Sequence, residues 1–363
     1  MEPTFAARLV AVGDTPEAID ELALSERWGD GLPVVPPTPE RVRAMLRYTD
    51  RRPDQIVARI APGFGEASVE RIAINAVLAG CQPCYLPVVI AAVEAVAEPT
   101  FNLQAIQTTT NPVTVMLLVN GPATAQLGIN AGHNCLGQGW RANATLGRAM
   151  RLILQNIGRA LPGDMDRATQ GQPGKYSMCC AENEAANPWE PLHVERGFEP
   201  TVSTVTMIGA AGTINVLSVA RETDDLLTSL AGSVACPGGN DYLRGGHPVI
   251  MLGPEHAEVL AKTGLSKAEI KQRLWQQSRI PARDFARADL ARLTRTREER
   301  LGPIEAETLI PIADEPSDLV IVVAGGPGTH STWLPTFGLT TPAIRPVVDA
   351  HRVPITRFGI PVH

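Results

Sequence analysis

The densest group of reactive side-chain types lies at residues 179–193 and contains Cys179, Cys180, Glu182, Glu184 and His193. A thiol close to a carboxylate and an imidazole can act as a nucleophile with an acid–base partner. We therefore take Cys179, Glu182 and His193 as catalytic candidates. The alternative interpretation is a solvated loop anchored by a tryptophan.

The same side-chain types could instead hold a metal ion, because Glu and His supply oxygen and nitrogen ligands. The metal-ligand candidates are His133 and Glu184, to which Glu182, His193 and His330 can be added. The sequence contains neither a pair of CxxC motifs nor an HExxH motif. A metal site is therefore the second choice after a thiol site.

Residues 132–139 (Gly-His-Asn-Cys-Leu-Gly-Gln-Gly) form a glycine-rich segment ahead of a predicted helix. Glycines let backbone amides approach a ligand, and a helix start favours an anion. A substrate carboxylate or phosphate could bind there, although no P-loop signature ends the segment. A plain tight turn is the alternative. The predicted substrate contacts are Asn134, Gly137, Gly139, Arg141, Asn143 and Thr145.

A second glycine-rich segment, residues 325–331, follows an apolar run that predicts a strand. In open parallel sheets, ligands gather beyond the carboxyl ends of the strands. This position makes His330 a further catalytic candidate and makes Gly326, Thr329 and Ser331 candidate substrate contacts. The glycine spacing does not match a dinucleotide-binding fingerprint.

Cys81 and Cys84 precede an apolar run at residues 86–97. A thiol at a helix N-terminus can have a lowered pKa, so Cys81 joins the catalytic candidates. A buried structural cysteine is the equally weighted alternative. We interpret Cys236 as a structural cysteine in a turn and His256 as a surface residue.

Several elements must position these side chains. Apolar periodicity predicts a buried helix at 86–97, a helix ending near Gly158, and a capping box that opens a helix at Ser266. Apolar, β-branched runs predict strands at 113–119, 202–208, 249–252 and 319–324. Strands that alternate with helices predict an α/β fold: a mostly parallel sheet covered by helices, with an N-terminal helical arm. We find no internal repeat.

The predicted organisation has three parts: an arm or cap at 1–60, a helix-rich α/β domain at 61–200 that carries the reactive motifs, and an α/β domain at 201–363. The chain has 363 residues, 44% of them hydrophobic, and a net charge of −6. The absence of a basic stripe argues against nucleic-acid binding. We expect no membrane span, no secretory signal, free cysteines and a cytoplasmic location.

Five stretches of the sequence, residues 26–38, 69–81, 141–148, 174–184 and 189–197, resemble a poorly characterised bacterial family. That family is associated with, and partly related to, the UGSC-motif (seleno)proteins, and residues 318–337 look like the end of those proteins. The resemblance covers most of the chain and implies that Cys81, Cys179, Glu182 and His193 fall in recurring motifs. The UGSC motif itself is absent. The resemblance implies no particular reaction.

The sequence thus predicts an enzyme that acts on a small polar or anionic metabolite by thiol redox or lyase chemistry. The alternatives are a metal-dependent lyase or hydrolase and a non-catalytic partner subunit of a selenoprotein-type system. A small-molecule substrate is the expected partner, and a homo-oligomer stays open. The sequence specifies no cofactor.

Overall fold

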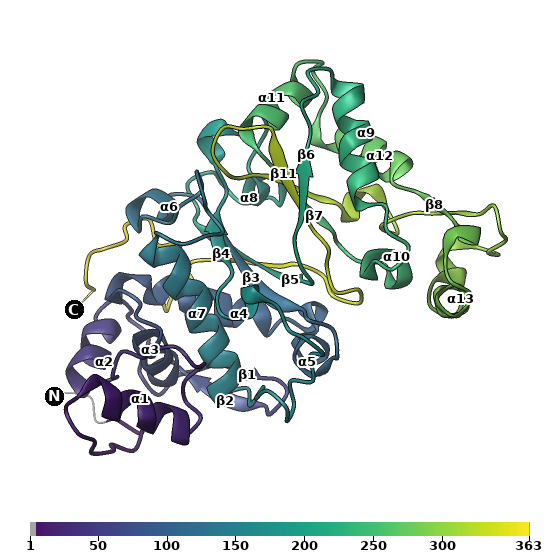
Figure 1. Cartoon of the computed structure of the whole chain (residues 1–363). Helices are drawn as coiled ribbons and strands as arrows, with labels where there is room; N and C mark the ends of the chain where they lie inside the picture. The colour runs from purple at the N-terminus through teal and green to yellow at the C-terminus, as the bar shows by residue number, and fades with distance from the viewer. Residues whose placement is uncertain (1–4, 363) are drawn as a thin grey trace.

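Two four-stranded sheets pack face to face in the computed structural model, which describes residues 5–362. One group of helices covers the outer face of the first sheet, and a second group covers the outer face of the other. In Figure 1 the strands accordingly lie between the purple-to-teal helices and the green helices. The α/β class predicted from the sequence is confirmed.

The first part of the chain contributes most of the first helical layer. Its elements are α1 (Pro16–Ser25), α2 (Pro39–Leu46), β1 (Ile56–Ile60), β2 (Gly65–Ser68), α3 (Val69–Leu78), α4 (Leu86–Val96), α5 (Leu103–Thr108), β3 (Thr114–Asn120), α6 (Ala123–Gln126), α7 (Arg141–Asn156), β4 (Cys179–Ala181) and α8 (Leu192–Glu195). The predicted helices at 86–97 and before Gly158 are confirmed as α4 and α7.

The second part of the chain begins with a long buried strand. Its elements are β5 (Thr204–Ala210), β6 (Ile214–Leu217), α9 (Thr223–Val234), α10 (Asn240–Arg244), β7 (Val249–Leu252), α11 (Pro254–Ala261), α12 (Lys267–Gln277), β8 (Ile280–Pro281), α13 (Arg287–Leu301), β9 (Leu309–Ile310), β10 (Val320–Val323), β11 (His330–Leu334) and β12 (Ala343–Pro346). The predicted capping box at Ser266 is present, with Glu269 as its partner.

The prediction of a mostly parallel sheet is wrong. The first sheet has the order β12-β5-β3-β4, and only β3 and β4 run parallel. The second has the order β6-β11-β7-β10, and only β7 and β10 run parallel. In the second sheet a short link, residues 324–329, turns the chain back between β10 and β11, so β11 runs against β7. In the first sheet β3 and β5 are antiparallel although the chain between them carries helices, so alternation of strands with helices does not fix strand direction.

The two sheets therefore repeat one pattern, which the sequence does not reveal. Each has two antiparallel pairings and one parallel pair whose crossover carries helices. One edge strand of each sheet is exchanged: β6 follows β5 along the chain but joins the second sheet, and β12 follows β11 but joins the first. This exchange ties the two halves together.

Three apolar layers fill the molecule. One lies between the first sheet and helices α3, α4 and α7, and another between the second sheet and helices α9, α11 and α12. The third lies between the sheets and includes Met116, Cys180 and Met251. In β4, Cys179 and Cys180 face different layers because successive side chains of a strand point to opposite faces.

The N-terminal arm packs against α7 through its helix α1 and the following loop (Figure 1). Residues 1–4 of the predicted arm lie outside the described residues. The predicted boundary at residue 200 falls between α8 and β5, and the first sheet takes strands from both sides of it. The three-part division stays a prediction.

No single helix within residues 5–362 has the length and apolar character to cross a membrane. The segments Pro83–Val96 and Pro99–Thr108 meet those requirements only together, as a pair bent by 74°.

Candidate functional site: an arginine-lined cavity

Helix α7 forms the floor of a cavity of about 790 Å³. An apolar stripe that includes Leu146, Met150 and Ile153 fixes one face of α7 against the first sheet. Gly147 allows a close approach, because a Cβ there would lie 2.4 Å from the Ser177 hydroxyl and 2.7 Å from a backbone nitrogen. This close packing holds α7 beside the segment that leads into β4.

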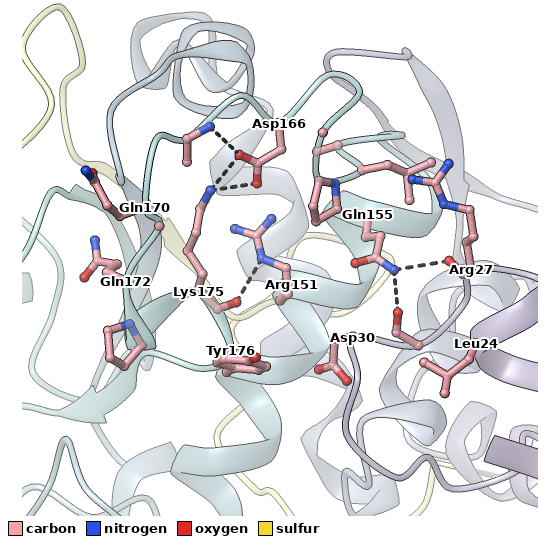
Figure 2. Close-up of a pocket in the computed structure, with 18 residues that line it drawn as sticks. Leu24, Arg27, Asp30, Arg151, Gln155, Asp166, Gln170, Gln172, Lys175 and Tyr176 are labelled. Atoms are coloured by element: carbon pink, nitrogen blue, oxygen red, sulfur yellow. Dashed lines mark hydrogen bonds and ion pairs between the residues drawn. The ribbon is translucent and has the colours of Figure 1, made fainter. Parts of the chain in front are cut away.

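The walls of this cavity come from two distant parts of the chain (Figure 2). One wall is the loop that follows α1, with Arg27, Gly29 and Asp30. The other is the irregular segment 160–176, with Asp166 and Lys175. Polar and charged groups from three segments therefore meet at a single opening.

Arg151 is the central polar side chain of the cavity and is only 7% exposed. Its Nε donates to the backbone oxygen of Lys175 at 3.0 Å, and its Nη1 donates to Gln107 at 3.3 Å. Its Nη2 has no hydrogen-bond partner, and within residues 5–362 no carboxylate forms an ion pair with the guanidinium. Burial lowers the pKa of Arg151, and the charges of Asp166 and Asp30 offset only part of this effect.

The two acidic side chains of the cavity already have partners. Lys175 Nζ lies 2.7 Å from both carboxylate oxygens of Asp166. Arg148 holds Asp30 through two hydrogen bonds of 2.8 Å. Neither carboxylate is therefore free to neutralise Arg151, and Figure 2 shows the guanidinium of Arg151 between the Lys175–Asp166 pair and Gln155.

Lys175 is the amine among the charged groups that line the cavity. Burial lowers the pKa of its amine, and the nearby guanidinium of Arg151 acts in the same direction, whereas the hydrogen bond and charge of Asp166 oppose the shift. A lysine with a lowered pKa beside a carboxylate can exchange a proton with a bound molecule.

A second polar cluster lies beyond the other end of β4, where Asn120, Glu182, Glu184 and His193 come together. Glu182 accepts hydrogen bonds from Asn120 Nδ2 at 2.6 Å and from the amide of Leu192 at 2.8 Å. Glu184 accepts from Asn120 Nδ2 at 3.1 Å and lies 3.9 Å from His193 Nδ1. Burial raises the pKa of Glu182. The structure thus brings together three sequence candidates, Glu182, Glu184 and His193.

Three members of this second cluster are closed to solvent, whereas 29% of the Glu184 side chain is exposed. Glu182 is 2% exposed, and both Asn120 and His193 are fully buried. Several of its polar atoms lack partners: both ring nitrogens of His193, Oδ1 of Asn120, and the hydroxyl of Thr204, which pairs with Asn120 across the sheet. Unpartnered buried groups of this kind mark a place for an internal water or a functional contact. A metabolite cannot reach them without movement of the protein.

The cysteine candidates lie away from the carboxylates. Cys179 faces the helical layer, opposite to Cys180, and burial raises the pKa of its thiol. Cys81 donates to the backbone oxygen of Thr145 at 3.3 Å, and burial raises its pKa to about 12. The thiol nearest the Glu182 side of β4 is Cys180, which interacts with Cys135 between the sheets.

The first glycine-rich segment is stabilised by its own side chains. Asn143 accepts from the amide of Asn130 at 2.8 Å and donates to the backbone oxygen of Cys135 at 3.0 Å. Asn134 donates to the backbone oxygen of Gln138 at 2.8 Å. These bonds fix a turn ahead of α7.

The other predicted contacts around this turn do not reach the cavity. Arg141 donates to the backbone oxygen of Gly80 at 3.0 Å, and Thr145 donates to the backbone oxygen of Arg141 at 2.8 Å. A Cβ at Gly137 would lie 2.2 Å from the Asn134 side chain, while Gly139 has open space around it. Contact of this segment with a ligand stays a prediction.

The second glycine-rich segment lies against the first one. A Cβ at Gly326 would lie 2.1 Å from Nδ1 of His133, so the imidazole packs directly on the glycine backbone. His330 is exposed and interacts with Asn215 at 3.1 Å. Thr329 accepts a hydrogen bond from the amide of Ser218 through its backbone oxygen.

The prediction that His256 is a surface residue is wrong, because it is only 1% exposed. Its Nδ1 lies 2.7 Å from the hydroxyl of Ser331, and its Nε2 lies 2.9 Å from the backbone oxygen of Ser218. The polar environment provided by β11 explains why a histidine next to glutamates in sequence turns inward. Ser331 is thereby engaged in the core of the second half.

Among residues 5–362, no three His, Cys, Asp or Glu side chains are grouped so that they could hold a metal ion. The metal candidates His133 and Glu184 lie in different environments, against Gly326 and next to Asn120 respectively.

Comparison of the sequence with protein-family models and with curated proteins gives no match. The resemblance to the UGSC-associated family stays a prediction.

Sequence reasoning missed the residues of the open cavity, chiefly Arg27, Arg151, Asp166 and Lys175. Two signals point to them in retrospect. Lys175 is one of only four lysines in the chain. Arg151 lies between Met150 and Leu152 of the apolar stripe of α7, so its side chain starts from a buried position of the helix.

Proposed function

We propose that the protein is an enzyme acting on a small anionic metabolite that binds in the cavity over Arg151. The observation that carries this proposal is the buried guanidinium of Arg151, which faces an open cavity without a protein carboxylate to neutralise it. Burying a charge is costly unless it is paired. An anionic ligand in the cavity would supply the missing counter-charge.

The charges around the cavity support an anion over a neutral ligand. The lining residues Arg27, Arg151 and Lys175 carry positive charge, against the carboxylates of Asp30 and Asp166. The lining therefore has an excess of positive charge, in a protein whose net charge is −6. A carboxylate or phosphate is the ligand class that this local excess favours.

Proton transfer by Lys175 is the chemistry that the cavity favours. The amine and the Asp166 carboxylate form an acid–base pair at the wall, close enough to Arg151 for the guanidinium to affect the pKa of the lysine. Such a pair can remove a proton from carbon next to a carboxylate or carbonyl, as a lyase or an isomerase requires. Within the predicted alternatives, this supports lyase chemistry over thiol redox chemistry.

A thiol mechanism is the weaker proposal. A thiolate is the reactive form of cysteine, and burial raises the pKa of both Cys179 and Cys81. Neither residue lines the cavity over Arg151. Alkylation by iodoacetamide of the native protein should therefore leave ligand binding unchanged.

Anion binding is tested by thermal unfolding at constant ionic strength with acetate, pyruvate, succinate and phosphate as separate probes. We expect at least one probe to raise the melting temperature of the native protein, because a ligand at 100 times its Kd adds about 2.7 kcal/mol of stability. Arg151→Met should abolish that shift. Arg295→Met, on the exposed side of α13, is the matched control and should retain it. Equal shifts in all three proteins would disprove the site.

Proton transfer is tested by NMR in D₂O, through loss of the methyl proton signal of pyruvate. We expect the native protein to accelerate this exchange. Lys175→Arg, which keeps a cation beside Asp166 but is no base at neutral pH, should remove the acceleration while pyruvate still binds. Exchange that is unaffected by Lys175→Arg would remove the lysine from the mechanism.

A further inference from the structure

Arg27 brings a second unneutralised positive charge to the cavity over Arg151. Its backbone is held in place, because its amide donates to Leu24 at 3.1 Å and its carbonyl oxygen accepts from Gln155 at 3.1 Å. Its side chain is exposed at the cavity wall, and no partner for the guanidinium occurs in the described part of the chain. Figure 2 shows Arg27 and Arg151 approaching the cavity from different elements, with Gln155 between them.

The backbone of Arg27 has a left-handed conformation, with φ of 58°. A residue other than glycine is strained there by about 1–3 kcal/mol, and such strain gathers at ligand-binding sites. The amide of Gln155 also donates to Gly29 at 2.8 Å, and that of Asn156 to Trp28 at 3.0 Å. Two side chains of α7 thus hold the loop so that Arg27 remains at the cavity wall.

A ligand with a single negative charge would neutralise only one of these arginines. The other charges at the cavity are matched inside the protein, Asp30 by Arg148 and Asp166 by Lys175. Arg27 on one wall and Arg151 on the floor remain, in a cavity of about 790 Å³. Two separated cations match two separated anionic groups better than they match one compact anion.

We infer that the ligand is a linear dicarboxylate, with one carboxylate on Arg151 and the other on Arg27. This inference rests on the proposed function. Arg151 is the buried anchor, so it sets the affinity for any carboxylate. Arg27 is the exposed anchor, so it distinguishes a ligand with two carboxylates from a ligand with one.

Isothermal titration calorimetry can test this with acetate, malonate, succinate, glutarate, adipate and inorganic phosphate. We expect the best dicarboxylate to bind at least about tenfold tighter than acetate, with an optimum at one chain length, since only one length spans both arginines. Arg27→Asn should remove this advantage and leave the acetate affinity within about twofold. Asparagine tolerates the left-handed backbone, so this variant keeps the loop conformation. Arg27→Lys should retain part of the advantage.

The outcomes separate this inference from the proposed function. If acetate binds and Arg151→Met abolishes its binding, but no dicarboxylate binds tighter than acetate, the dicarboxylate inference fails and the proposed function stands. Phosphate as the tightest probe would also overturn the inference, in favour of one compact anion. Equal weakening of acetate and dicarboxylate by Arg27→Asn would show that Arg27 does not select the second group. If none of the probes binds, both proposals fail.

Discussion

Arg151 in the first half of the molecule and Arg297 in the second half occupy similar places but have different partners. Both are buried, with 7% and 1% exposure, and both line a cavity beside the segment that leads into the second strand of a parallel pair. Arg297 donates to Asp314 through Nε at 3.2 Å and Nη2 at 2.8 Å. The guanidinium of Arg151 donates only to the side-chain oxygen of Gln107 and the backbone oxygen of Lys175, and its Nη2 has no partner.

This difference is the reason for proposing a ligand in the cavity over Arg151 and none in the cavity beside Arg297. Around Arg297 the protein supplies the carboxylate itself, and the backbone oxygens of Tyr242 and Pro311 complete the hydrogen bonding. Around Arg151 the acidic side chains are committed to Lys175 and Arg148. The repeated sheet pattern places a buried arginine next to a cavity in each half, and only the first half leaves the counter-charge to come from outside.

The largest expected effect is on stability, from Arg297→Met. Removing one partner of a buried, hydrogen-bonded ion pair costs about 3–5 kcal/mol, because the remaining groups lose their compensation. Chemical denaturation should show this loss in the free energy of unfolding. Arg295→Met on the same helix is exposed and should change it by less than about 0.5 kcal/mol. A loss of under 1 kcal/mol at Arg297 would remove the contrast between the two arginines.

Arg151→Met should act mainly on ligand binding. Without ligand, we expect the free energy of unfolding to change by no more than about 1 kcal/mol, because the variant removes an uncompensated buried charge along with two hydrogen bonds. Carboxylate binding should weaken by about 1.5–3 kcal/mol, the usual contribution of a hydrogen bond to a charged group. Calorimetry gives the change in carboxylate affinity, and chemical denaturation of the same preparation gives the change in the free energy of unfolding. A destabilisation as large as that of Arg297→Met would mean that Arg151 has a structural role.

A smaller effect concerns Asp241, which lies beside Arg297 and accepts hydrogen bonds from the amide and hydroxyl of Thr336. Burial raises the pKa of Asp241 to about 7. The folded protein then binds more protons than the unfolded chain between about pH 4 and 7, so stability is lost as the pH rises through this range. The slope has an upper limit of about 1.4 kcal/mol per pH unit.

Asp241→Asn should remove this contribution and flatten the profile of unfolding free energy against pH. Asp225→Asn, an exposed position on α9, is the control and should leave the profile unchanged. Identical profiles for the native protein and Asp241→Asn would show that Asp241 titrates normally and that two charged carboxylates, those of Asp314 and Asp241, balance Arg297.

The sequence predicts much of the secondary structure. Elements with a clear apolar stripe or capping motif, such as α4, α7 and the start of α12, lie where they are expected. Strand direction is not encoded in such patterns, because a buried apolar run looks the same in parallel and antiparallel pairs. The exchange of β6 and β12 between the sheets is likewise invisible in composition and periodicity.

The candidate site is harder to predict than the fold. The grouping of Glu182, Glu184 and His193 follows from their closeness in sequence. The separation of Cys179 from these three residues depends on which face of β4 packs against the helices. A shift of one residue in the strand register would exchange the positions of Cys179 and Cys180. The proposed role of Arg151 depends on the lack of a carboxylate partner. Whether such a partner is present depends on how all the segments around the cavity fold, and no single sequence motif encodes it.

The most direct test is a high-resolution crystal structure of the native protein grown with succinate at constant ionic strength. We predict a succinate carboxylate in the cavity over Arg151, with Asp166 still on Lys175 and Asp30 still on Arg148. A protein carboxylate on Arg151, or only water in this cavity while succinate binds elsewhere, would contradict the account.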